Sequence, residues 1–164
     1  MHLRQRLVRW GAGLSEIALA VVFIFAGAVK AVDPNAFAEQ IMRYQLAPWP
    51  VAVVLALWLP FLEVAAGAGL FIPALRTGAL AVITALLIAF TAALLSAWYR
   101  GLNIDCGCLG PALGPQSVAQ ALGRDGFLLL LLAGVWIDRA RRRRTLPTPA
   151  GALSTSPGRI SPQP

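Results

Sequence analysis

The sequence predicts an all-α membrane protein, an antiparallel bundle of four transmembrane helices. Of its 164 residues, 58% are hydrophobic and only 13% are charged, whereas soluble domains are about 25% charged. The apolar residues form four long runs, at 12–32, 50–73, 77–98 and 117–137. Each has about 20 residues or more, the length that a helix needs to cross a hydrocarbon core about 30 Å thick. So short a soluble chain could not bury four such helices.

The chain begins with a basic segment, residues 1–11, which is predicted to be a cytoplasmic N-terminus because it carries three arginines. The apolar run at 12–32 has small residues near its end, as a cleaved secretory signal does. It is longer than a usual signal core, however, and contains Glu16 and Lys30. We therefore expect an uncleaved first helix; cleavage is the alternative, and it would leave the later loops on the same sides of the membrane.

The first connection, 33–49, contains a stretch from Phe37 to Tyr44 with helical spacing. We expect it to form a short helix on the outer surface. Proline is tolerated in the first turn of a helix, so Pro50 is a suitable start for the second span, at 50–73. The connection to the third span leaves room only for a tight turn, which predicts a hairpin of the second and third helices.

The last span is predicted to start at a capping box. Ser117 is followed three residues later by Gln120, a pair that satisfies two backbone N–H groups at the start of a helix. With this helix the membrane domain covers 12–138. Residues 139–164 are first basic and then rich in Pro, Ser, Thr and Gly, which predicts a disordered cytoplasmic tail.

The placement of the basic residues predicts the orientation. Arginines lie before the first run, in the short second connection and after the last run, and the net charge is +7. Basic segments stay on the cytoplasmic side, so both termini are predicted to be cytoplasmic in a bacterial inner membrane. The connections at 33–49 and 99–116 then face the periplasm or the cell exterior. The same placement argues against a nucleic-acid partner, because the bilayer accounts for it.

Cys106 and Cys108 are the only two cysteines and lie in the outward-facing third connection, separated by Gly107. Disulfides persist in an oxidising compartment, and a small strained bridge is the labile, exchangeable kind. The pair is therefore a candidate redox-active site. A local structural bridge and a Cu(I) site are the alternatives from spacing alone. The only histidine, His2, lies at the opposite face, so no closed four-ligand zinc site is expected.

Two charged residues within the predicted spans form a second candidate site. Glu63 lies well inside the second span, where an acid costs on the order of 3 kcal/mol, so it should face the bundle interior with a partner. Lys30 lies near the outer end of the first span and is expected to snorkel outward. One interpretation is a proton or quinone site; the other is a polar contact that fixes helix packing.

The chain resembles the methylamine utilisation protein MauE family, which belongs with the DoxX-like redox-associated membrane proteins. The resemblance covers about residues 14–137, and Leu109 stands where family members usually have Phe. It is carried by Gly27-Ala28-Val29-Lys30, Asp33-Pro34-Asn35-Ala36-Phe37, Tyr44, Pro48, Leu59-Pro60-Phe61-Leu62-Glu63, Phe90 and Cys106-Gly107-Cys108-Leu109-Gly110.

The resemblance implies a role in processing, transport or maturation of the small (beta) subunit of periplasmic methylamine dehydrogenase, including its disulfide formation, in methylamine metabolism. A periplasmic thioredoxin-like protein is the implied partner. By position, Cys106 and Cys108 match the Cys-Gly-Cys of the family, and Lys30 and Glu63 match its intramembrane polar positions. The first hypothesis is thus thiol–disulfide exchange with that partner or a disulfide-containing client, which needs no cofactor; a quinone is the possible cofactor.

Two alternatives stay open at this point. A quinone-linked thiol oxidase would place a quinone near Glu63, but such oxidases relay electrons between two cysteine pairs, and this chain has one. A non-catalytic membrane scaffold or transporter would use the cysteine pair only to shape its loop.

Overall fold

The computed structural model describes residues 2–102 and 117–144, and within these two ranges the chain is helical, without strands. The all-α prediction is therefore confirmed. The helices are α1 (His2–Val32), α2 (Pro34–Arg43), α3 (Trp49–Gly69), α4 (Arg76–Tyr99) and α5 (Val118–Arg144).

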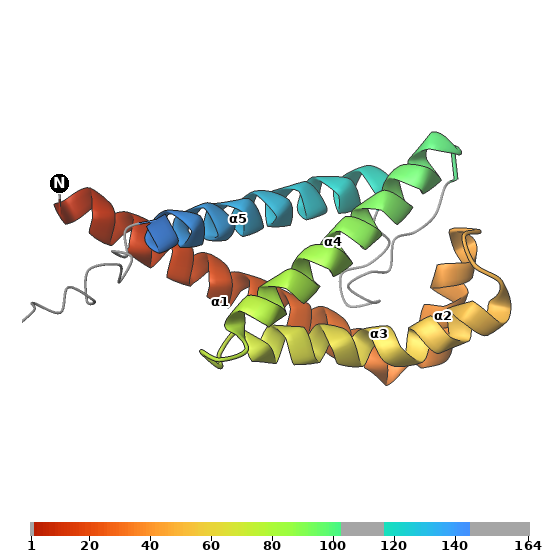
Figure 1. Cartoon of the computed structure of the whole chain (residues 1–164). Helices are drawn as coiled ribbons and strands as arrows, with labels where there is room; N and C mark the ends of the chain where they lie inside the picture. The colour runs from red at the N-terminus through yellow and green to blue at the C-terminus, as the bar shows by residue number, and fades with distance from the viewer. Residues whose placement is uncertain (1, 103–116, 145–164) are drawn as a thin grey trace, which may run out of the picture.

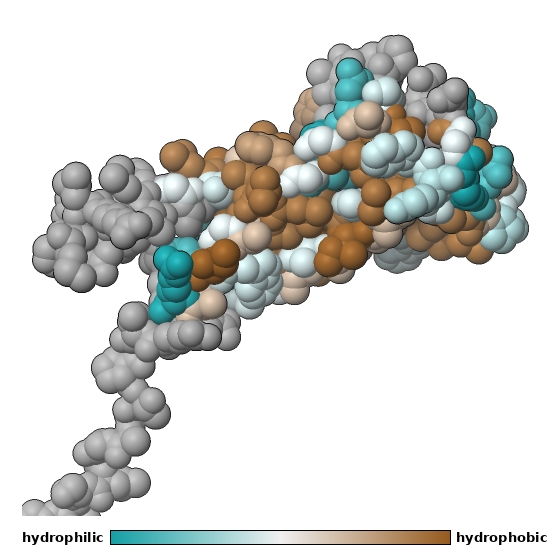
Figure 2. Space-filling model, turned by 90° about the horizontal axis from the view of Figure 1, so that it is seen from above, coloured by the Kyte–Doolittle hydropathy of each residue, from teal (hydrophilic) through white to brown (hydrophobic). Residues whose placement is uncertain are grey.

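Four of these helices are long and apolar enough to cross a membrane. Figure 2 shows apolar side chains over the middle of the molecule and hydrophilic residues gathered toward its two ends, as a bilayer requires. Large apolar side chains also remain exposed on the surface of the bundle. The candidate spans are Gly13–Val32, Trp49–Gly69, Arg76–Tyr99 and Val118–Arg141.

The long helices pack as antiparallel neighbours (Figure 1). Helix α1 lies against both α3 and α5, and α4 packs against α3 and α5. Across α4 and α5, the Trp136 indole N–H donates to Thr84 Oγ1 at 3.2 Å, while Leu94 and Ala121 are buried together in a small cluster farther along. Their opposite order along the two helices gives the antiparallel direction.

Helices α1 and α3 approach closely at two glycines. A Cβ atom added to Gly27 would lie 2.6 Å from the Pro60 carbonyl oxygen, and one added to Gly67 would lie 2.9 Å from the Ala20 carbonyl oxygen. In a bilayer, where apolar burial does not drive helices together, small residues of this kind allow backbones to pack tightly. Pro60 lies inside α3, which continues through it from Trp49 to Gly69.

Helix α3 ends at Gly69, four residues before the predicted end of the second span. The ring of Pro73 would clash with the carbonyl group four residues earlier, at Gly69, if the helix continued. The chain turns through 70–75 instead, and Arg76 Nε donates to the Leu70 carbonyl oxygen at 3.1 Å. The turn joins α3 and α4 as the predicted hairpin.

The short helix predicted at 37–44 is confirmed as α2, which begins earlier, at Pro34. Asp33 caps it, because its carboxylate accepts a hydrogen bond from the Ala36 backbone N–H at 3.0 Å. Phe37 and Ala38 are buried against α3, so α2 is an amphipathic helix held on the bundle.

Polar contacts define one end of the bundle, which we call the Tyr44 end. Arg100, just after α4, donates from its guanidinium to the Tyr44 carbonyl oxygen, just after α2. The start of α5 also lies here, because Val118 and Tyr44 pack against the same cluster of Leu94 and Ala121. The predicted capping box is confirmed: Gln120 N–H donates to Ser117 Oγ at 3.3 Å, and Ser117 N–H donates to Gln120 Oε1 at 3.1 Å.

Candidate functional site

The two candidate sites from the sequence have different outcomes. Cys106 and Cys108 lie outside the residues that the structure describes. Lys30 and Glu63, in contrast, are both described, and the fold brings them into direct contact from α1 and α3. The candidate site with geometry is therefore the intramembrane one.

Lys30 and Glu63 form a buried ion pair. Lys30 Nζ lies 2.5 Å from Glu63 Oε1, and the two side chains are only 5% and 1% exposed. Glu63 lies six residues before the end of α3 and fourteen after its start, roughly 9 Å and 21 Å at a rise of about 1.5 Å per residue. The prediction that Glu63 faces the interior with a partner is confirmed, and that partner is Lys30.

The expectation that Lys30 snorkels outward is wrong. Its ammonium group turns into the bundle, because the interior offers a carboxylate and two aromatic faces in place of water. Nζ lies 5.2 Å from the centre of the Phe37 ring and 4.7 Å from the centre of the Phe90 ring. Aromatic faces attract a cation within about 6 Å, most strongly where water is excluded.

The partners of Lys30 come from three other helices. Glu63 belongs to α3, Phe37 to α2 and Phe90 to α4. The end of α1 is thereby held to three elements through one ammonium group, and α2 is connected to the charged interior by Phe37.

A second charged pair, which the sequence analysis missed, lies on α5 and is partly buried. Arg124 donates to Asp125 Oδ1 at 3.1 Å, and Asp125 is only 3% exposed. The available signal was the presence of two adjacent charged residues inside the apolar run at 117–137. Such residues within a span are rare and usually face the interior of the bundle.

Both charged pairs line one cavity of about 40 Å³, formed by α1, α3, α4 and α5. Ligand pockets for drug-sized molecules measure about 300–1,000 Å³, so this cavity is small by comparison. The interpretation of Glu63 as a quinone site therefore gains no support from the geometry. The lining residues are Val22, Phe23, Ala26, Lys30, Glu63, Leu87, Phe90, Arg124, Asp125 and Leu128.

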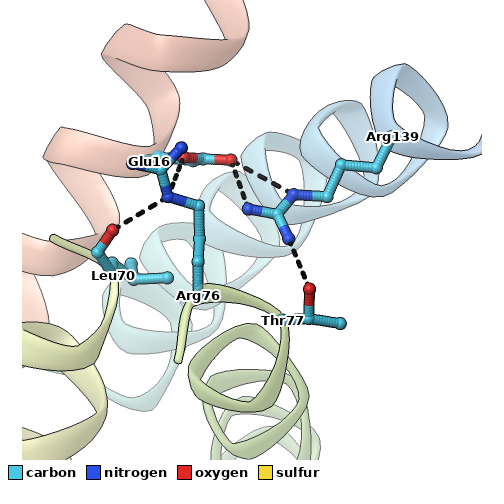
Figure 3. Close-up of polar contacts among 5 residues, drawn as sticks. All are labelled: Glu16, Leu70, Arg76, Thr77 and Arg139. Carbon is cyan, nitrogen blue, oxygen red and sulfur yellow. Dashed lines mark hydrogen bonds and ion pairs between the residues drawn. The ribbon is translucent and has the colours of Figure 1, made fainter. Parts of the chain in front are cut away.

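A separate polar network holds the opposite end of the bundle, which we call the Arg139 end (Figure 3). Glu16 Oε1 accepts from Arg139 at 3.0 Å, and Glu16 Oε2 lies 3.6 Å from Arg76 Nε. Arg139 also donates to Thr77 Oγ1 at 3.2 Å. The network ties α1 to α4 and α5, and it gives Glu16 partners distinct from those of Lys30.

The charged residues that line the cavity could bind and exchange protons. Its charged members are an ammonium, a guanidinium and two carboxylates. Carboxylates can bind and release protons. Intramembrane acidic residues in this kind of setting mark proton relays as well as packing contacts.

The comparisons with known proteins decide the family. The family model described as "Methylamine utilisation protein MauE" matches residues 8–137, most of the chain. The chain belongs to the MauE family. It is 33% identical over 130 residues to the methylamine utilization protein MauE of Paracoccus denitrificans, a match that covers 79% of this chain and 68% of the relative.

A second relative agrees. The methylamine utilization protein MauE of Methylophilus methylotrophus is 30% identical over 128 residues, covering 74% of this chain and 67% of the relative. No solved structure gives a significant match. The part of this MauE-family protein that the family model matches includes both charged pairs and both cysteines.

Proposed function

We propose that this MauE-family protein supports thiol–disulfide chemistry at the periplasmic face of a bacterial inner membrane, in methylamine utilisation. The observation that carries the proposal is the Cys106-Gly107-Cys108 sequence, the only cysteines of the chain, within the region that the family model matches. Its two relatives are named methylamine utilization proteins, which supports the metabolic setting.

The charges of the described helices support the orientation in this proposal. Arg76 and Arg139 lie together at the Arg139 end, and the basic run 141–144 follows in the sequence. Basic residues favour the cytoplasmic side, so the Tyr44 end faces the periplasm. The segment with the cysteines follows Leu102 and precedes Ser117, which both adjoin helix ends at the Tyr44 end.

The proposed chemistry is disulfide exchange with a thioredoxin-like partner or a client. A thiolate of the reduced member attacks one sulfur of the disulfide in the other, which forms a mixed disulfide and releases one thiolate. The second cysteine of the originally reduced member then attacks the mixed disulfide, which releases the other protein with both of its cysteines reduced. Two electrons pass from the dithiol to the disulfide and two protons follow them, so one disulfide replaces another without a further oxidant.

The client in this proposal is the small subunit of methylamine dehydrogenase, the disulfide-rich polypeptide implied by the family resemblance. The protein would bring that subunit and a thioredoxin-like partner to the same membrane surface. Cys106 and Cys108 carry the exchange. The two charged pairs, Lys30–Glu63 and Arg124–Asp125, belong to the membrane helices of the same protein.

Labelling of the cysteines tests the orientation. A membrane-impermeant maleimide should modify Cys106 and Cys108 in reduced spheroplasts, because that side of the membrane is accessible to it. The control is Ser154→Cys in a background with both cysteines replaced by serine, which should be labelled only after lysis. Labelling of Cys106 and Cys108 that requires lysis would overturn the orientation.

Trapping of a mixed disulfide tests the exchange. Cys106→Ser or Cys108→Ser leaves one thiol that cannot complete the reaction, so one of these variants should accumulate a covalent complex that dithiothreitol releases. Mass spectrometry identifies the bound protein. The double serine variant, as the matched control, should form no complex and should leave the disulfides of the dehydrogenase small subunit incomplete. Normal client disulfides in the double variant would show that the pair only shapes its loop.

A further inference from the structure

The cavity joins two charged pairs that are far apart in the sequence. Lys30 comes from α1 and Glu63 from α3, whereas Arg124 and Asp125 come from α5, and all four residues line the same space. Among the lining residues, α4 contributes only Leu87 and Phe90, which do not titrate. Within residues 2–102 and 117–144, these four are the charged side chains that line the cavity.

The size of the cavity limits its occupant. It has about 40 Å³, and a bound water needs roughly 10–15 Å³ of space measured in this way. About three water molecules therefore fit.

The charge of the cavity limits the occupant further. Two cationic side chains, Lys30 and Arg124, stand against two carboxylates, Glu63 and Asp125. These opposite charges balance one another, so the cavity needs no bound counter-ion. A small neutral occupant that both donates and accepts hydrogen bonds fits both conditions, and water is that occupant.

We infer that water binds in this cavity and hydrogen-bonds to both charged pairs, so that Glu63 and Asp125 form one proton-exchanging site inside the membrane. A proton taken up by one carboxylate passes through the water to the other, with no transfer of electrons. Lys30 and Arg124 hold the carboxylates at the cavity. This inference stands apart from the proposed cysteine chemistry, because none of its groups lies in the cysteine segment.

Hydroxyl-radical footprinting tests the water in the unaltered protein, in lipid nanodiscs. Radicals formed from bound water oxidise the side chains beside it. Leu87 lines the cavity and Leu132 does not, although both are only 2% exposed, so they form a matched pair. We expect several-fold faster oxidation of Leu87, with ¹⁸O taken from labelled water. Equal rates would overturn the inference.

A cavity-filling variant sharpens this test. Ala26 lines the cavity, and Ala26→Leu should bring the oxidation of Leu87 down to the rate of Leu132, whereas Ala26→Ser should leave it high. Loss of the difference in the serine variant as well would contradict a water site. If Ala26→Leu does not fold, the comparison in the unaltered protein still decides.

Infrared titration tests the shared proton. The carboxyl band of Glu63, assigned with Glu63→Gln, should change its titration midpoint by more than about one pH unit in Asp125→Asn, because interacting sites titrate as a pair. Glu39→Gln, at an exposed position of α2, is the control and should leave the midpoint unchanged. Asp125→Glu replaces the asparagine variant if that one does not fold. If footprinting shows the bound water but the midpoint is unchanged, the water site stands and the proton sharing between Glu63 and Asp125 is overturned.

Discussion

Replacing Lys30 with methionine lowers the free energy of unfolding of the bundle by about 3–5 kcal/mol, the cost of leaving one charge of a buried pair without its partner. The pair is almost fully enclosed, with side-chain exposures of 5% for Lys30 and 1% for Glu63. The variant also loses both cation–π contacts of the ammonium group. The measurement is reversible unfolding of the purified protein in bicelles, followed by the loss of helical circular dichroism.

Two variants control this result. In the double variant Lys30→Met, Glu63→Met no charge of the pair is left uncompensated, so a large part of the lost stability should return, because apolar residues often replace a buried pair at little cost. Arg43→Met removes an exposed charge from α2 and should change stability by no more than about 0.5 kcal/mol. A loss in Lys30→Met as small as that in Arg43→Met would show that the pair contributes little.

Replacing Gly27 with alanine destabilises the bundle by about 1–3 kcal/mol, the usual cost of overpacking a close contact. The new Cβ atom would lie 2.6 Å from the Pro60 carbonyl oxygen and 2.8 Å from Val64 Cγ2. The first of these atoms belongs to the backbone, so α1 and α3 must move apart, and this movement also disturbs the Lys30–Glu63 pair beside it. The same unfolding assay in bicelles measures the loss.

Gly134→Ala is the matched control for this prediction. Gly134 lies within α5, and a Cβ atom added there meets nothing within 4 Å. The substitution should therefore be neutral or raise stability by up to about 1 kcal/mol, because alanine is the better helix former. If the two alanine variants have equal stability, close backbone approach at Gly27 does not hold α1 to α3.

The fold was predictable because a bilayer demands long apolar helices. The four spans, the short helix after the first span and the capping box at Ser117 each follow from a local pattern of residues. Helix α3 ends earlier than predicted, because the ring of Pro73 would clash with the carbonyl group of Gly69, four residues before it.

The site was only partly predictable, because it depends on which helices meet. The sequence places Glu63 in a span and so requires a partner, but the choice of Lys30 rests on the close approach of α1 and α3 at Gly27. Lys30 also has two aromatic neighbours, from α2 and α4, that no local pattern reveals. Asp125 was overlooked because Arg124 and Asp125 are only two charged residues within the long apolar run at 117–137.

The Lys30–Glu63 pair has a consequence for the order in which the chain enters the bilayer. Helix α1 is synthesised before α3, and Lys30 precedes Glu63 by 33 residues, so the inserting chain already offers a positively charged side chain when the carboxyl group of α3 arrives. Asp125 is synthesised much later, but Arg124 comes immediately before it. We therefore expect α3 to insert efficiently only behind α1, whereas α5 brings its own counter-ion into the membrane.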